Sequence, residues 1–157
     1  MGRNVPAFPL LLALAACAPG EQASAPAPGT RQQTVINPVV HFEIPVEDMD
    51  RAVRFYEAVF GYRLRRETVD GYPMAFFPRA DGGTGASGAL AKGDVYKPAK
   101  AGPLLYFDVA DIDETLARAT AQGATVLYPK KDIGEAGYVA EIEDSEGNRI
   151  ALSAPRD

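Results

Sequence analysis

The chain contains one strongly patterned stretch that occurs twice, and this repeat limits the possible folds more than any other feature. Residues 39–64 read VVHFEIPVEDMDRAVRFYEAVFGYRL: an apolar strand, an amphipathic helix, a glycine and a second strand. Residues 103–128 read PLLYFDVADIDETLARATAQGATVLY and repeat that order more weakly. A shift of 63 residues places Asp48 on Asp111, both at positions typical of a helix N-cap, and Gly61 and Gly123 are natural helix stops. The pattern predicts two copies of one folding unit.

Alternating apolar positions and turn signals extend each copy by further short strands. These strands are predicted at residues 62–68, 72–79 and 89–91 in the first copy, and at 124–128, 138–143 and 149–153 in the second. Each half then reads strand, helix, strand, strand, strand, with a first module at 38–92 and a second at 103–155 within a domain at 35–157. Two such modules can pair into a curved mixed sheet with the helices outside and a concave cleft inside. The predicted fold class is α+β.

The front of the chain has a different character from this domain. Residues 1–17 have the order of a signal peptide. A positive charge, Arg3, lies near the start, the apolar run AFPLLLAL follows, and Cys17 ends the segment. Leu14-Ala15-Ala16-Cys17 resembles the lipobox of bacterial lipoproteins, in which the cysteine is acylated. That resemblance implies export and membrane anchoring through Cys17, at the outer membrane or the periplasmic face in a Gram-negative cell, although an ordinary cleaved signal remains the alternative. Residues 18–34 are rich in Ala, Pro and Gln, and we expect a disordered tether.

Charge and cysteine content exclude some functions. The net charge is -5, and no run of Lys or Arg resembles a nucleic-acid-binding face, so we expect no nucleic-acid partner. The single cysteine cannot form an internal disulfide. The domain is large enough to form a core without a metal or disulfide.

His41 and Glu43 are the candidate site residues of the first strand. Alternation assigns Phe42 and Ile44 to the face that the helix covers, which leaves His41 and Glu43 on the opposite face, open to a ligand. His41 can act as a general base that Glu43 orients. A lone histidine in a strand is also often a hydrogen-bonded pocket residue without a chemical role.

The same alternation suggests further ligand-binding residues around the cleft. They are Phe77, Arg79, Tyr106 and Glu141. Aromatic walls with a few polar groups suit a small organic ligand. Packing or surface roles for these four residues remain open.

The segments HFEIPVEDMDRAVRFYEAVFG, FDVADIDETLARATAQGA and EDSEGNRIALSAP resemble the vicinal oxygen chelate superfamily, which includes glyoxalase I, extradiol dioxygenases, and bleomycin and fosfomycin resistance proteins. The resemblance covers residues 35–155. It implies a metal held by side chains on the first and last strand of each module. Of those positions only His41 can bind a metal, because Ala89, Leu104 and Ala151 occupy the other three. The resemblance is also compatible with a homodimer.

These observations leave three functions open. The first is a lipid-anchored, metal-independent protein that binds a small molecule, with no cofactor expected. The second is a glyoxalase-like lyase, isomerase or dioxygenase that holds a divalent metal with His41 and other ligands such as Glu43 or Glu141. The third is an interaction module that pairs through exposed sheet edges.

Overall fold

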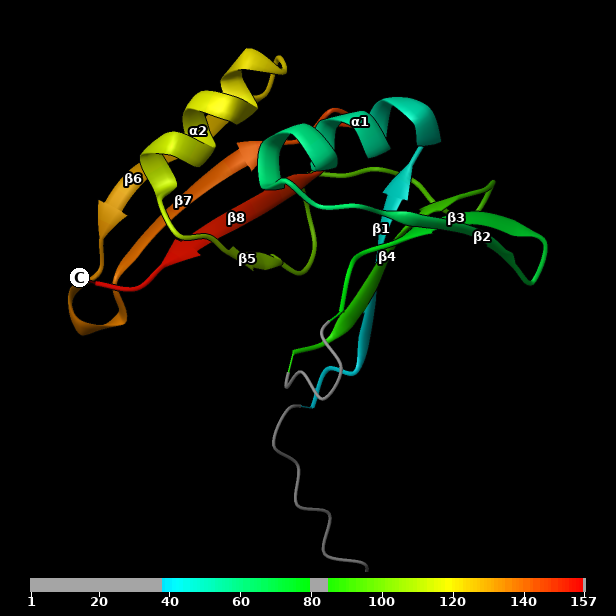
Figure 1. Cartoon of the computed structure of the whole chain (residues 1–157), viewed down its shortest axis with the longest axis horizontal. Coiled ribbons are helices and arrows are strands. Elements are labelled where there is room, and N and C mark those ends of the chain that lie inside the picture. Colours follow the sequence, from blue (N-terminus) through cyan, green and yellow to red (C-terminus); the bar gives the residue numbers. More distant parts are fainter. Residues whose placement is uncertain (1–37, 80–84, 157) are drawn as a thin grey trace, which may run out of the picture. The chain divides into compact units, whose positions relative to one another are not determined.

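The computed structural model describes residues 38–79 and 85–156 (Figure 1). The predicted signal peptide, Cys17 and the tether lie outside the described residues. Within the described part of the chain, no helix has the length and apolar character needed to cross a membrane.

Each half of the domain contains the predicted series of elements. The first module consists of β1 (His41–Val46), α1 (Met49–Phe60), β2 (Arg65–Val69), β3 (Tyr72–Phe76) and β4 (Ser87–Lys92). The second consists of β5 (Tyr106–Asp108), α2 (Ile112–Ala121), β6 (Thr125–Asp132), the short 3-10 helix η1 (Gly134–Ala136), β7 (Tyr138–Glu143) and β8 (Arg149–Ala154). The predicted β-α-β-β-β modules and the α+β class are confirmed.

The two modules have the same sheet topology. The strand orders are β1-β4-β3-β2 and β5-β8-β7-β6, with a parallel first pair and antiparallel pairs after it. The strands form two separate four-stranded sheets, whereas the sequence suggested one curved sheet. β1 and β5 therefore lie at equivalent edges of their sheets.

The predicted helix ends are present in both modules. Asp48 accepts a hydrogen bond of 2.9 Å from the backbone N–H of Arg51, and Asp111 accepts one of 2.9 Å from that of Glu114. These bonds satisfy backbone donors that have no partner within the helix. α1 ends at Gly61, whose φ of 72° is left-handed and favours glycine.

The larger of two hydrophobic clusters in the described residues takes side chains from both modules. α1 covers the face of the first sheet that carries Phe42 and Ile44, as the alternation predicted. Gly88 of β4 makes room for the Phe42 ring, since a Cβ atom there would lie 2.2 Å from it. The largest fully buried side chains are Tyr56, Leu90, Ile112, Ile142, Ile150, Leu152, Val46, Val59 and Thr115.

The turn between β7 and β8 reaches across to the first module. The Glu146 carboxylate accepts hydrogen bonds from the backbone N–H groups of Glu47 (3.0 Å) and Asp48 (2.9 Å), where α1 begins. The Arg51 guanidinium donates two more bonds to Glu146, each of 2.8 Å. α1 is thus capped both by its own Asp48 and by a residue of the other module.

Asp144 forms a second link in the same turn. Its carboxylate accepts a hydrogen bond of 2.8 Å from the Tyr56 hydroxyl in α1, and further bonds from the backbone and side-chain amides of Asn148 (2.8 and 3.0 Å). Burial raises the pKa of Asp144, and these hydrogen bonds oppose that rise. Burial and the adjacent Asp144 charge together raise the pKa of Tyr56 well above its ordinary value. The turn therefore holds the modules together through buried polar groups.

Candidate functional site

His41 and Glu43 lie together on the face of β1 opposite α1. Their side chains are about one-third exposed, and His41 Nε2 is 3.8 Å from Glu43 Oε1. Residues two apart on a strand share a face, which brings the two groups close without requiring contact. The structure therefore brings together the two residues that the sequence proposed as a base and its partner.

Ser87, at the start of β4, determines which nitrogen of His41 carries the proton. The Ser87 hydroxyl donates a hydrogen bond of 3.0 Å to the backbone carbonyl of Val40. Its oxygen lies 2.7 Å from His41 Nδ1. Since the hydroxyl has only one hydrogen, Nδ1 must be the donor in this second bond. In neutral His41 the Nε2 atom then carries a lone pair on the side of Glu43.

Tyr96 supports the other end of this group. Its hydroxyl donates a hydrogen bond of 2.8 Å to Glu43 Oε2, which raises the pKa of Tyr96 above its ordinary value. The Tyr96 ring packs perpendicular to Tyr72, with 5.4 Å between ring centroids. Ser87, His41, Glu43 and Tyr96 form one polar row, which we call the His41 cluster.

The His41 cluster lies beside a small apolar floor. Ala89 and Ala91 of β4 and Met74 of β3 are buried on the same face of the sheet. Phe76 lies next to His41, with 6.3 Å between ring centroids, and the Arg65 guanidinium lies 5.0 Å from the Phe76 ring. A ligand on this face would meet aromatic carbon beside a hydrogen-bonding edge.

Glu43 also borders a cavity between the two modules, which we call the junction cavity. The cavity has a volume of about 300 Å³ and lies between β1, the segment 97–103 and the start of β8. Its walls are mostly apolar, and its polar groups include Lys97 and Arg149. A cavity of this size and character is typical of a site for a small organic molecule.

Asn148 fixes the walls of the junction cavity. Its side-chain amide donates a hydrogen bond of 2.9 Å to the Pro45 carbonyl of β1 and accepts one of 3.0 Å from the backbone N–H of Ala99. These two bonds tie opposite sides of the cavity together within the folded chain, and such preorganisation lowers the ordering cost of binding.

Two other predicted ligand residues lie on the second sheet. Tyr106 and Glu141 are both cross-strand partners of Ala151, so they share one face. Tyr106 is exposed, whereas Glu141 is largely buried, accepts a hydrogen bond of 2.7 Å from Arg149 Nε and forms an ion pair of 2.7 Å with Arg149 Nη2. Arg149 lines the junction cavity, and it is through Arg149 that Glu141 adjoins the site.

The prediction that Phe77 faces the cleft is wrong. Phe77 packs into the core against Phe42 and Tyr56, with ring centroids 5.8 and 5.4 Å away. The face of β3 that His41 shares carries Phe76, because adjacent residues of a strand point to opposite sides. Arg79 is exposed beyond the end of β3, where the alternation no longer sets its direction.

The residues of this chain do not fit the metal site of the superfamily. Ala89 and Ala151 lie at the centres of their sheets, where their methyl groups cannot bind a cation, and Leu104 is equally inert. His41 already uses Nδ1 for Ser87, and among the described residues the carboxylate that pairs with it is Glu43. Among residues 38–79 and 85–156, no three His, Cys, Asp or Glu side chains cluster as metal ligands.

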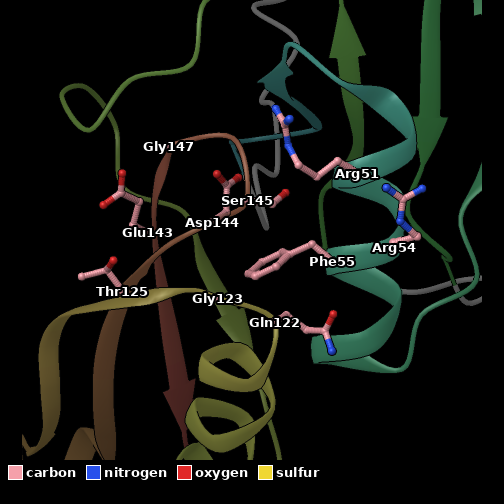
Figure 2. A pocket seen from close by; sticks show the side chains of 10 residues that line it. All are labelled: Arg51, Arg54, Phe55, Gln122, Gly123, Thr125, Glu143, Asp144, Ser145 and Gly147. Atoms are coloured by element: carbon pink, nitrogen blue, oxygen red, sulfur yellow. The ribbon is translucent and has the colours of Figure 1, made fainter.

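A second cavity, of about 380 Å³, lies between α1, the end of α2 and the β7–β8 turn (Figure 2). Figure 2 shows Arg51 and Arg54 on α1, Glu143 at the end of β7 and Asp144 in the turn that follows. Arg51 and Asp144 are engaged in the links between the modules, and Glu143 forms a 2.7 Å ion pair with Lys100. Because most of its charged groups are already paired, this cavity is the weaker candidate for a ligand.

Residues 39–152 match the model of the Glyoxalase/Bleomycin resistance protein/Dioxygenase superfamily, and the chain belongs to this superfamily. The chain is 29% identical over 119 residues to a lactoylglutathione lyase of Haemophilus influenzae, which covers 71% of this chain and 88% of that protein.

Solved structures agree with this assignment. The chain is similar to TnmS3, an antibiotic binding protein from Streptomyces sp. CB03234, with 26% identity and a TM-score of 0.54 over 77% of this chain and 98% of that one. It also resembles a fosfomycin resistance protein from Listeria monocytogenes, with 18% identity and a TM-score of 0.59 over 77% of this chain and 93% of that one. At that identity the second likeness concerns the fold alone.

Sequence reasoning missed four residues of the site. Four residues, Ser87, Tyr96, Lys97 and Asn148, lie outside the strands and helices that the sequence predicted. One signal was available for Tyr96, since an aromatic side chain in a polar linker requires a packing surface. Ser87 carries no local signal, because its partner His41 is 46 residues away.

Proposed function

We propose that this protein binds a small organic molecule where the His41 cluster meets the junction cavity, without a metal ion. The observation that carries the proposal is Glu43, which belongs to the polar cluster and also borders the apolar cavity. One side of the site offers hydrogen-bonding groups and the other accepts an apolar body, the usual division of a ligand site. The likeness to TnmS3, an antibiotic binding protein, supports this kind of function.

The geometry of the His41 cluster also supports mild acid–base chemistry on the bound molecule. Neutral His41 offers Nε2 as an acceptor, and Glu43 stabilises the imidazolium that would form if Nε2 took a proton. Ser87 and Tyr96 hold these two groups in place. If the protein only sequesters the molecule, binding alone is sufficient. If it also transfers a proton, the imidazole of His41 is required.

The test is mass spectrometry of small molecules extracted from the purified full chain. We expect a molecule that co-purifies with the natural chain and is depleted by His41→Leu and by Glu43→Gln. Tyr106→Phe is the matched variant, because Tyr106 occupies the place of Glu43 in the second module. Retention of the molecule in both first-module variants would reject the site, and depletion in Tyr106→Phe would extend it to the second sheet.

A metal-dependent lyase is the second candidate, supported by the lactoylglutathione lyase of Haemophilus influenzae among the relatives. Metal analysis of the purified full chain separates the two. Stoichiometric divalent metal that disappears in His41→Ala would overturn the metal-independent proposal.

We also propose that the domain is exported and anchored through acylated Cys17. The support is the run Leu14-Ala15-Ala16-Cys17, which holds the only cysteine of the chain. Metabolic labelling with an alkyne fatty acid is expected to label the natural chain and not Cys17→Ser. Equal labelling of both would reject the anchor.

A further inference from the structure

The junction cavity combines an apolar interior with Lys97, a positive charge that has no partner among residues 38–79 and 85–156. The walls contributed by Phe42, Ile44, Leu105 and Ile150 are apolar, and Asn148 ties the cavity's two sides together. An apolar interior of this kind favours a ligand body that sheds its hydration shell on entry.

The charged groups at the cavity differ in how far they are already satisfied. Arg149 donates a hydrogen bond from Nε to Glu141 and forms an ion pair with it through Nη2, so much of its charge is neutralised. Glu43 accepts a hydrogen bond from Tyr96 and lies beside His41. Lys97 is exposed and forms no ion pair or hydrogen bond with the residues that the structure describes. Among the charged groups of the described residues that line the cavity, Lys97 is therefore the one without a hydrogen-bond or ion-pair partner.

We infer that the molecule bound here is a small amphipathic anion, whose apolar body fills the junction cavity and whose acidic group pairs with Lys97. This inference rests on the proposed function and specifies its ligand class. An exposed ion pair contributes little, so the apolar body supplies most of the affinity and Lys97 supplies selectivity for the acid. A cationic ligand would be held by Glu43 instead, and removal of the Lys97 charge would then strengthen its binding.

The test compares two fluorescent probes that differ in one group. 1-Anilinonaphthalene-8-sulfonate carries a sulfonate, and N-phenyl-1-naphthylamine has the same ring system without it. Both are titrated into the full natural chain and into Lys97→Gln. We expect the variant to bind the sulfonate probe about threefold to fivefold more weakly and the neutral probe within about twofold of the natural chain. Added salt is expected to weaken the binding of the sulfonate probe and to leave the binding of the neutral probe unchanged.

Two further variants locate the binding and control for surface charge. Lys131→Gln removes an exposed lysine of β6 outside the cavity and is expected to change neither affinity. Ala101→Phe adds a ring on an exposed residue that lines the cavity, and is expected to abolish binding of both probes. Melting temperatures of all variants show that the fold is kept.

The possible failures point to different conclusions. In one outcome, Ala101→Phe loses binding of both probes, but Lys97→Gln, like Lys131→Gln, changes neither affinity. That outcome would overturn the anionic ligand class and would leave the proposed binding function in place. Unchanged binding of both probes in a folded Ala101→Phe would overturn the junction cavity as a ligand site, and with it both proposals. Stronger sulfonate binding in Lys97→Gln would also overturn the inference.

Discussion

The two modules share one fold but carry different side chains across the middle of their sheets. In the first, a row runs from Glu43 through Ala89 and Phe76 to Arg65. In the second, the equivalent row runs from Tyr106 through Ala151 and Glu141 to Tyr128. Both rows keep an alanine at the same place, whereas the groups around it differ. The duplicated unit therefore preserves the requirements of folding more strictly than those of a site.

The modules also differ in how they depend on each other. The β7–β8 turn of the second module caps α1 with Glu146 and binds Tyr56 with Asp144. By contrast, the N-cap of α2 is Asp111, a residue of the second module itself. The first module presents the His41 cluster, and the second supplies the turn that holds the first in place. Three predictions test this division.

The largest effect is expected at Asp144. Asp144→Ala removes the acceptor of the Tyr56 hydroxyl and of the Asn148 amides and leaves buried donors unpaired. We expect the free energy of unfolding to fall by about 3 kcal/mol in a urea titration. Asp132→Ala, which breaks a surface ion pair with Arg156, is the control and should cost under about 1 kcal/mol. Equal losses in both variants would contradict a buried link between the modules.

A smaller effect is expected at Glu146. Burial raises its pKa, but the hydrogen bonds from Arg51, Asp48 and Glu47 lower it more, so the folded pKa lies below the ordinary value. Glu146→Gln is expected to cost about 1–2 kcal/mol near neutral pH.

The sign of the pH dependence at Glu146 follows from this lowered pKa. Because its folded pKa is depressed, Glu146 stabilises the protein above its unfolded pKa, and this contribution is lost as the pH falls through the folded pKa. Asp144 acts in the opposite direction, since its folded pKa is raised. Urea titrations at several acidic pH values should therefore show the gap between natural chain and Glu146→Gln closing as pH falls. Glu114→Gln, on the exposed face of α2, should leave the profile unchanged.

The smallest effect on stability, and a specific effect on the site, is expected at Ser87. Ser87→Ala removes the acceptor that holds the proton on His41 Nδ1, and should change the free energy of unfolding by under about 1 kcal/mol. Since the chain has one histidine, nitrogen NMR reports its tautomer without ambiguity. At a pH where the imidazole is neutral, we expect the natural chain to carry the proton on Nδ1 and the variant to shift it toward Nε2. Ser153→Ala on β8 should leave the signals unchanged, and an unshifted tautomer in Ser87→Ala would contradict the bond as assigned.

Local features of the fold were predictable because each depends on neighbours in the chain. The caps at Asp48 and Asp111, the stop at Gly61 and the face of β1 that carries His41 follow from helix and strand periods. The error at Phe77 shows the limit of this reasoning. The strand ends at Phe76, and a displacement of one residue exchanges the face that meets the ligand for the face that meets the core.

The sequence by itself determined the duplicated module, its fold class and the two helix caps, since all of these depend on residue type and short-range spacing. Only the tertiary structure decided which groups meet. Ser87 reaches His41 across 46 residues, and Asp144 reaches Tyr56 across 88. Nothing in the local sequence marks such pairs, because packing of the two modules creates them. That packing also forms the junction cavity beside Glu43, and with it the site.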